Sequence, residues 1–402
     1  MVMLLDEETS LPVSLRAWRD ICPTNEPQWQ QPWEALSSFF NAAGYQRFRS
    51  RGRNSMTYPD ESLPPYPALD SFGLYGDRSE LKPTFFPLSQ VVAARDRENR
   101  DVVIKVVSKG DEGRRELEIL QLLNSEPLRS DPANATVRVL EFLEFHDWHF
   151  VVMPLCDQCD ELPFLNVSEG FDFADQVLAG LAFLHENRIA HLDISCDNIL
   201  INHHGTVPQT EIWTTPSEPI YKIWPPPEWR STFPARYFFI DFGYSQYFAK
   251  DASLDKCLAE PFPQGREHRA PEMRRATNYN PFAADVYATA RTLYGWLKDA
   301  ADETPSLLIL LRDMTSQNPS RRPTAKMALE RFRALRSTIP GEKLLEVHEL
   351  ELIDYSLVPR SFIVMLRDLI ETRQWTIAYR FTWISLKMWV TKTFGLKPAV
   401  QL

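Results

Sequence analysis

Short β-rich runs recur between residues 90 and 153, and the later ones alternate apolar and polar residues with the period of a β-strand. A polar turn at 96–100 separates the first two runs, and Asp147 lies in the turn between the other two. Residues 112–123, between the two pairs, carry leucines at helical spacing with charges opposite. The predicted strands are 90–95, 101–107, 138–145 and 149–153. The pattern therefore predicts a small antiparallel sheet with one amphipathic helix.

The period becomes helical after Pro154. Residues 173–186 place Val177, Leu181 and Leu184 on one face, and helices are predicted to dominate from there to about residue 336. Two short strands, at 198–201 and 237–240, flank an insertion at 204–236 that is rich in proline and tryptophan. A loop of that length is usually functional or disordered.

Composition and charge narrow the classes of protein. The formal net charge of −10 argues against nucleic acid as the main ligand, because binding phosphates takes a basic face. The five cysteines suggest no disulfide framework, and the N-terminus has no secretion-signal pattern, so we expect a cytoplasmic or nuclear protein. Cys156 and Cys159 form a single C-x-x-C motif, without the second pair of ligands that a zinc site needs.

The C-terminal tail is the nearest approach to a membrane-binding segment. Residues 375–390 are rich in aromatics and interrupted by basic residues, a composition that can lie on a membrane surface. No run of 18 apolar residues occurs, so a spanning helix is not expected. We favour a tail that docks as a helix on the main domain.

Two motifs in the second half of the chain carry the chemistry. His191-Leu192-Asp193-Ile194-Ser195-Cys196-Asp197-Asn198 forms an H-x-D-x-x-x-x-N loop, and Asp241-Phe242-Gly243 follows downstream. Phosphoryl transfer needs a carboxylate to take up the proton of the incoming hydroxyl, and an amide and a second carboxylate to hold Mg²⁺ on the phosphates. Asp193, Asn198 and Asp241 match these three roles.

With these motifs, the chain resembles the eukaryotic protein kinase family. Val102-Val103-Ile104-Lys105 is similar to the family's V-A-I-K strand, and Glu116 lies on the helix that carries its partner glutamate. Ala270-Pro271-Glu272 resembles the A-P-E that closes the activation segment. The resemblance implies that Lys105 and Glu116 form an ion pair that holds the phosphates of ATP. It also implies that Asp285 braces the catalytic loop and that Arg322 pairs with Glu272.

The same resemblance assigns the nucleotide pocket and the domain organisation. Met153 would guard the back of the pocket, Leu155 and Cys156 would lie in the hinge that meets adenine, and Leu200 would line the apolar floor. The implied fold is α+β and two-lobed. Its expected division is an N-terminal extension at 1–81, a kinase-like domain at 82–336 with a small lobe at 82–153 and a large lobe at 154–336 that carries the insertion, and a helical extension at 337–402. Trp18, Trp29 and Trp33 in the N-terminal extension could cap the small lobe or recruit a partner.

The chain departs from the family pattern at three places. The glycine-rich loop should lie just before Val91, yet residues 84–91 contain no glycine. Ser195 stands where serine/threonine kinases carry a lysine near the transferred phosphate, and Leu192 replaces an arginine that in many members holds a phosphorylated activation loop.

These observations leave three readings open. The first is an ATP- and Mg²⁺-dependent protein kinase that acts on serine or threonine of a protein substrate. The second is a pseudokinase, a binding or scaffold module with weak or no phosphoryl transfer. The third is a small-molecule kinase of related architecture, which the A-P-E segment and the stretch at Arg322 argue against.

Overall fold

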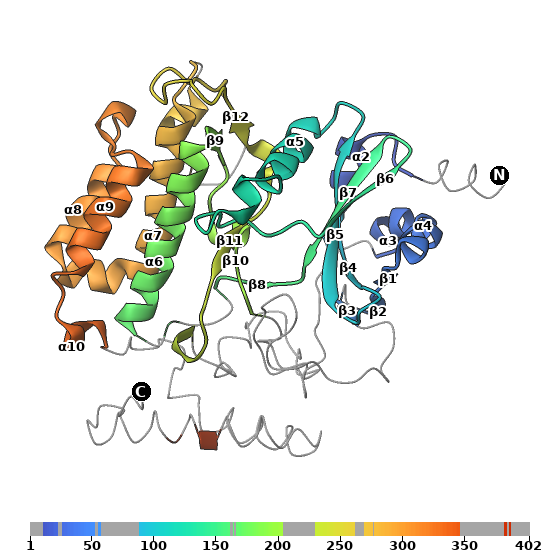
Figure 1. The fold of residues 1–402 in the computed structure, drawn as a ribbon, viewed down its shortest axis with the longest axis horizontal. Coiled ribbons are helices and arrows are strands. Elements are labelled where there is room, and N and C mark those ends of the chain that lie inside the picture. The colour runs from blue at the N-terminus through green and yellow to red at the C-terminus, as the bar shows by residue number, and fades with distance from the viewer. Residues whose placement is uncertain are drawn as a thin grey trace.

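A computed structural model gives the fold of the chain. It describes residues 11–22, 26–52, 55–57, 88–160, 164, 166–203, 230–261, 269–275, 277–345, 382, 383 and 386. The described part forms two lobes, a β-sheet lobe with the N-terminal helices and a mainly helical lobe, as Figure 1 shows. This is the expected two-lobed α+β fold.

The small lobe is built on an antiparallel sheet of five strands in the order β1-β4-β5-β7-β6. Its strands are β1 (Gln46–Arg47), β4 (Val91–Arg95), β5 (Asp101–Lys109), β6 (Glu141–Phe145) and β7 (Trp148–Pro154). The predicted hairpin and the predicted second strand pair are confirmed, except that residues 138–140 precede β6 instead of belonging to it. A separate two-stranded sheet pairs β2 (Arg49–Gly52) with β3 (Ser55–Thr57).

Both faces of the central strand β5 are buried. Val102, Ile104 and Val106 belong to one apolar cluster, and Val107 belongs to another. A strand that is covered on both sides reads as a continuous apolar run, which explains the sequence Val102-Val103-Ile104-Lys105-Val106-Val107. Lys105 interrupts that run, so its ammonium lies within the lobe and not in solvent.

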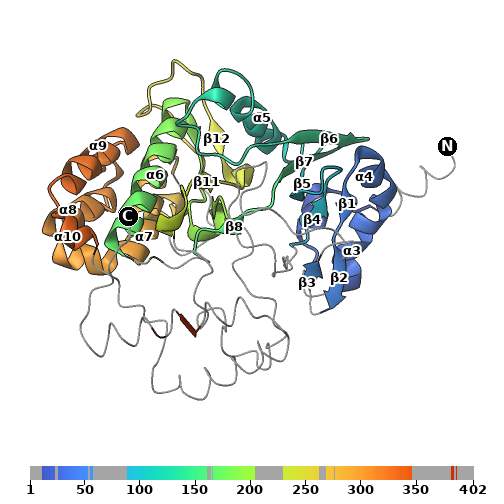
Figure 2. The ribbon, with the colours of Figure 1, turned by 60° about the horizontal axis from the view of Figure 1, so that its bottom comes forward.

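The N-terminal segment covers the outer face of this sheet (Figure 2). It consists of α2 (Leu15–Arg19), α3 (Glu26–Ala35), α4 (Ser37–Ala43) and β1. Trp18 and Trp33 are fully buried in the outer cluster, and both indole N–H groups donate to the carbonyl oxygen of Ser89, at 2.8 and 2.9 Å. Of the two roles left open for these tryptophans, the packing favours a cap on the small lobe. The boundary at residue 81 stays a prediction, although residues 11–22 and 26–48 pack as part of the lobe.

The strand that pairs with the outer edge of β4 comes from far upstream. Gln46 and Arg47 lie opposite Arg95 and Ala94, so residues 48–90 connect these two neighbouring strands. The resemblance placed a glycine-rich loop just before Val91, where residues 84–87 lie outside the described part of the chain. Leu88 forms an isolated bridge with Val91 instead.

The helix predicted at 112–123 is α5 (Arg114–Leu123), which starts two residues later and packs on the inner side of the sheet. The residue before it is Gly113, whose φ of 76° is in the left-handed region. A Cβ at this position would lie 2.1 Å from the carbonyl oxygen of Val107 and 2.6 Å from Leu15 of the N-terminal segment. Glycine is therefore required for the close approach of α2, β5 and α5.

The large lobe consists of helices and several short strands. Its helices are α6 (Val167–Glu186), α7 (Pro281–Glu303), α8 (Pro305–Met314), α9 (Ala325–Arg336) and α10 (Gly341–Leu344). Its short strands are β8 (Asp157–Gln158), β9 (Ile189–Ala190), β10 (Ile199–Ile201), β11 (Tyr237–Phe239) and β12 (Gln246–Tyr247). Helix α6 begins six residues before the predicted start, because Asn166 caps it by accepting a hydrogen bond from the Glu169 N–H.

Some predicted segments lie outside the described residues. Most of the insertion (204–229) is among them, while the two predicted flanking strands are present as β10 and β11 and pair with each other. Residues 346–381 and nearly all of 382–402 are also outside, so the proposed tail helices stay predictions. Among the helices that the structure describes, none has the length and apolar composition needed to cross a membrane.

Candidate active site

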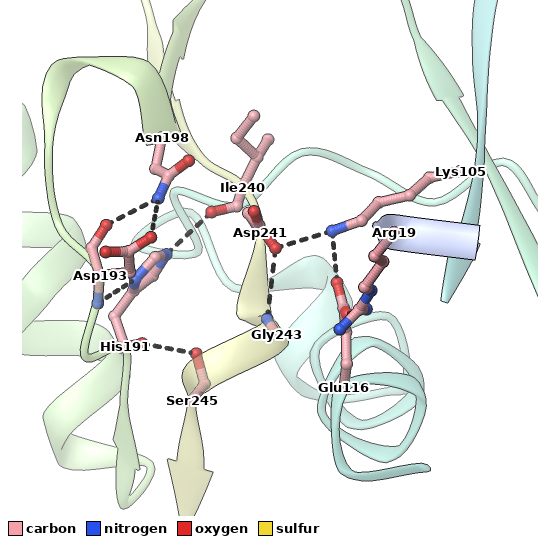
Figure 3. A network of polar contacts seen from close by, with 10 residues as sticks. All are labelled: Arg19, Lys105, Glu116, His191, Asp193, Asn198, Ile240, Asp241, Gly243 and Ser245. Atoms are coloured by element: carbon pink, nitrogen blue, oxygen red, sulfur yellow. Dashed lines mark hydrogen bonds and ion pairs between the residues drawn. The ribbon is translucent and has the colours of Figure 1, made fainter. Parts of the chain in front are cut away.

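The site begins with the buried ion pair that the sequence implied. Lys105 on β5 donates to Oε1 of Glu116 on α5 at 2.6 Å and to Oδ1 of Asp241 at 2.8 Å. Figure 3 shows these three side chains meeting between the sheet, the helix and the turn that follows β11. Residues separated by up to 136 positions in the sequence thus converge on one ammonium group.

Charge and burial set the ionisation of this group. Burial lowers the pKa of Lys105, but the charges of Asp241 and Glu116 outweigh it and leave the pKa raised. Burial raises the pKa of Asp241, yet the Lys105 charge and hydrogen bond, with smaller contributions from His191 and the Gly243 N–H, lower the pKa to about 2. Both groups are therefore charged at neutral pH.

A pH-dependent contribution to stability follows from the Asp241 value. A carboxylate with a lowered pKa in the folded state stabilises the fold above its unfolded pKa, and this stabilisation is lost as the pH falls toward the folded pKa. We expect unfolding by urea between pH 5 and pH 2 to show a steeper loss of stability in the wild type than in an Asp241→Asn variant. Equal pH slopes in the two proteins would contradict the assigned interaction.

The catalytic-loop motif holds its acid and amide together. Asn198 donates through Nδ2 to the carbonyl oxygen of Asp193 at 2.7 Å and to its carboxylate Oδ2 at 3.0 Å. The other carboxylate oxygen, Oδ1, accepts from Arg269 at 2.9 Å. Asp193 is buried, so its carboxylate is held in one orientation from both sides.

Asp285 of α7 fixes the loop backbone, as the resemblance implied. Its two carboxylate oxygens accept from the backbone N–H groups of His191 and Leu192, each at 2.7 Å. Leu192 has a φ of 66° and Asp241 a φ of 62°, values that non-glycine residues rarely adopt. Such strain persists only where the surrounding structure enforces it, and it gathers at functional sites.

Two oxygen donors are available for a cation. Both side-chain hydrogen bonds of Asn198 run from Nδ2 to Asp193, which leaves the amide oxygen for another partner, and Asp241 offers a half-buried carboxylate. Mg²⁺ is usually bound by one or two protein oxygens together with substrate phosphates and water. The donor set fits that pattern, and within the described ranges no cluster of three or more acidic, histidine or cysteine ligands competes with it.

The expected nucleotide-pocket residues lie along the connection between the lobes. Met153 is the penultimate residue of β7 and lies opposite Val103 of β5, and the Leu155 N–H donates to the carbonyl oxygen of Asp101 at 3.1 Å. Cys156 is half-buried in the connection, and Leu200 lies on β10 with a partly buried side chain. Their contact with adenine stays a prediction.

Two arginines of the site were not predicted from the sequence. Arg19 of α2 donates through Nη2 to Oε2 of Glu116 at 3.0 Å, opposite the oxygen that binds Lys105. Arg269 pairs with Asp193. Only its position directly before Ala270-Pro271-Glu272 could have drawn attention to Arg269, and Arg19 follows the buried Trp18 without any motif.

Comparison with known proteins agrees with this geometry. The chain is 31% identical over 155 residues to a Wee1-like protein kinase of Oryza sativa subsp. japonica, covering 34% of this chain and 28% of that protein. It is 30% identical over 131 residues to NUAK family SNF1-like kinase 2 of Rattus norvegicus, covering 29% of this chain and 20% of that protein. The chain thus spans less than a third of the length of either relative.

The family comparison covers more of the chain than these relatives do. The protein kinase domain matches residues 88–301, which include Lys105, Glu116, Asp193 and Asp241. The match spans just over half of the 402 residues and includes strands β4 to β7, α5 and the catalytic loop. The chain therefore belongs to the protein kinase domain family.

Proposed function

We propose that the chain is an ATP- and Mg²⁺-dependent protein kinase that transfers the γ-phosphoryl group of ATP to a serine or threonine hydroxyl of a protein. One observation carries the proposal: Lys105 contacts both Glu116 and Asp241, while Asn198 contacts Asp193 in the adjoining loop. His191 links the two halves, since its Nε2 lies 2.9 Å from the carbonyl oxygen of Ile240. A pure binding module has no chemical need for all of these groups.

The side chains divide the work of nucleotide binding. Lys105 holds the α- and β-phosphates as a charged donor, and Glu116 orients its ammonium group. Asp241 and Asn198 would hold Mg²⁺ through their oxygens, and the ion would supply positive charge beside the phosphates.

Asp193 acts on the incoming hydroxyl group. A bond forms between the substrate oxygen and the γ-phosphorus, and the bond from the γ-phosphorus to the β–γ bridging oxygen breaks, leaving its electron pair on ADP. The hydroxyl proton passes to the Asp193 carboxylate. Asn198 keeps that carboxylate in position through its 3.0 Å hydrogen bond.

The second candidate is a pseudokinase that binds or scaffolds without efficient transfer. The absence of glycine from residues 84–91 favours it, because side chains there oppose a close approach of the backbone to phosphates. The direct contact between Lys105 and Asp241 is compatible with either candidate, since nucleotide phosphates and Mg²⁺ would enter between them.

Radiolabelled phosphate transfer from ATP tests the proposal. The purified chain is assayed for label on itself and on a generic basic protein, with and without Mg²⁺, beside the Asp241→Asn variant, and labelled residues are identified by phosphoamino-acid analysis. We expect Mg²⁺-dependent label on serine or threonine in the wild type alone. Equal label in both proteins would indicate a contaminating kinase and contradict the proposal.

Nucleotide binding separates the two candidates when transfer is low. A ligand at 100 times its Kd should stabilise the fold by about 2.7 kcal/mol, which a thermal-shift titration with Mg²⁺·ATP detects. A shift without any transfer would favour a nucleotide-binding pseudokinase. If the protein shows neither a thermal shift nor transfer, the remaining candidate is a scaffold role.

Arg19 is expected to support activity from outside the matched family region. An Arg19→Ala variant leaves Glu116 with Lys105 as its one remaining ion-pair partner in the described structure, so α5 is held less firmly. A hydrogen bond between charged groups contributes about 1.5–3 kcal/mol, and we expect kcat/KM for ATP to fall roughly tenfold. Steady-state kinetics measure the loss.

Arg16 provides the matched control. It lies on the same helix, is 87% exposed and pairs only with Asp20, at 3.7 Å, among the interactions described for it. Arg16→Ala should therefore leave kcat/KM unchanged, and Arg19→Lys should recover part of the loss. Equal losses in the two alanine variants would assign the effect to the helix and not to the Glu116 contact.

A further inference from the structure

Position 195 is a neutral site next to the proposed catalytic base. Ser195 lies two residues after Asp193, its side chain is buried, and its Oγ has no hydrogen-bond partner among the residues that the structure describes. Phosphoryl transfer spreads negative charge over the oxygens of the moving group, and fixed cations beside that group lower the barrier. A serine hydroxyl cannot supply such a charge.

A cation reaches the same place from another segment. The Arg269 guanidinium donates through Nη2 to Oδ1 of Asp193 at 2.9 Å, and each of the two side chains is 6% exposed. Its Cζ also lies 4.7 Å from the centre of the Tyr244 ring, next to Gly243. The charge is therefore fixed between the catalytic loop and the turn that carries Asp241.

The backbone that presents Arg269 is anchored to the large lobe. Ala270 is fully buried, and Glu272 pairs with Arg322, whose Nη2 lies 2.9 Å from Oε2 of Glu272. Arg322 also donates to the carbonyl oxygen of Ala283 at 2.8 Å. This is the pairing that the resemblance implied, and it keeps residues 269–272 from moving away from Asp193.

A contribution to folding stability does not by itself explain the Arg269–Asp193 ion pair. Two charges taken out of water lose hydration free energy, and their attraction repays this only partly, so apolar pairs of similar size often serve stability as well or better. Asp193 is already oriented by Asn198 on its other oxygen. A permanently charged guanidinium at this point is therefore better explained by chemistry than by folding.

We propose that Arg269 supplies the cation of the phosphoryl-transfer step that Ser195 cannot supply. This inference rests on the proposed kinase activity. As the bond from the substrate oxygen to the γ-phosphorus forms and the bond to the β–γ bridging oxygen breaks, the Arg269 charge offsets charge on the phosphoryl oxygens and holds Asp193 toward the hydroxyl. Arg269 keeps its protons throughout, because a guanidinium is not deprotonated in proteins.

The most direct test removes the positive charge of Arg269 and places one at position 195. Arg269→Ala should lower kcat by about 10²–10³-fold while the KM for ATP changes little, since an interaction made in the transition state has been removed. The Arg269→Ala/Ser195→Lys double variant places an ammonium beside Asp193 in the space that the guanidinium leaves. We expect it to regain at least about tenfold in kcat, and Arg269→Lys to be intermediate.

A binding measurement tests the same point without turnover. Mg²⁺·ADP with aluminium fluoride mimics the phosphoryl group in transfer, and transition-state mimics bind more tightly than ground-state ligands. In the wild type, we expect aluminium fluoride to raise the melting temperature above that with Mg²⁺·ADP alone; this further rise is the fluoride increment. Arg269→Ala should keep the Mg²⁺·ADP shift and lose that increment, and the double variant should regain it. Arg275→Ala, an exposed arginine nearby, is the control and should behave like the wild type.

The outcomes separate the inference from the proposed function. An Arg269→Ala variant with unchanged or higher kcat, or with the full fluoride increment, would overturn the inference and leave the kinase proposal intact. A wild type with an Arg269-dependent increment but no phosphate transfer would overturn the kinase proposal and, with it, the catalytic role of Arg269, which would then only bind the phosphoryl mimic. A wild type without any Mg²⁺·ADP shift would overturn both.

Discussion

The Asp241→Asn variant is expected to lose phosphoryl transfer by on the order of 10³-fold while keeping its fold. The substitution keeps the shape of the side chain and removes its charge. Asp241 is one of the two proposed Mg²⁺ ligands, and its Oδ1 lies 2.8 Å from the Lys105 ammonium. An amide at this point is a weaker ligand and leaves Lys105 with Glu116 as its single carboxylate partner among the contacts described.

Single-turnover transfer with saturating ATP measures this loss apart from binding. Asp251→Asn is the matched control, because Asp251 is exposed in the same segment and lies outside the network of Figure 3. The control should keep wild-type transfer. A drop of less than about tenfold in Asp241→Asn would mean that Asp241 does not hold the metal, since removal of a single electrostatic contact already costs about 10²-fold.

The sequence was most informative where neighbouring residues carry a joint signal. The apolar run Val102 to Val107 predicted a strand, and its resemblance to the family's V-A-I-K strand assigned Lys105 a glutamate partner. Glu116 follows eleven positions later on a helix that the leucine spacing predicted, and the two meet at 2.6 Å. Local periodicity and a known pair of motifs were sufficient for this half of the site.

Contacts between distant segments without a motif were not predictable in the same way. Arg19 meets Glu116 across 97 positions, and Arg269 meets Asp193 across 76. An arginine in a loop or a short helix is usually solvated, so nothing in the local pattern separates these two from exposed arginines such as Arg16. Each contact lies within one lobe and forms only when segments far apart in the sequence fold together.

The edge strand β1 was not predicted from the sequence, for a related reason. Gln46 and Arg47 form only two residue pairs with β4, too short a run for strand periodicity to register. The apolar run of β5 did contain a hint, because a strand buried on both faces requires a cover for each. The cover on the outer side is the N-terminal segment with its tryptophans.

Trp33→Ala is expected to lower the free energy of unfolding by about 3–5 kcal/mol, the usual cost of truncating a buried tryptophan. Trp33 is fully buried. The centre of its ring lies 5.1 Å from the ring centre of Trp18, 5.9 Å from that of Phe40 and 6.1 Å from that of Phe150. The variant leaves a cavity between the N-terminal helices and the sheet, and the carbonyl oxygen of Ser89 loses one of its two indole donors.

Urea unfolding followed by circular dichroism measures the change, with Phe142→Ala as the control. Phe142 lies on β6 of the same sheet but is 39% exposed, so its truncation should cost about 1 kcal/mol or less. Because a domain is stable by only about 5–15 kcal/mol, the loss of Trp33 removes a large fraction of that margin. A cost at Trp33 no greater than that at Phe142 would mean that the N-terminal helices α2 to α4 are an appendage to the small lobe, and the dependence of activity on Arg19 would then lose its structural basis.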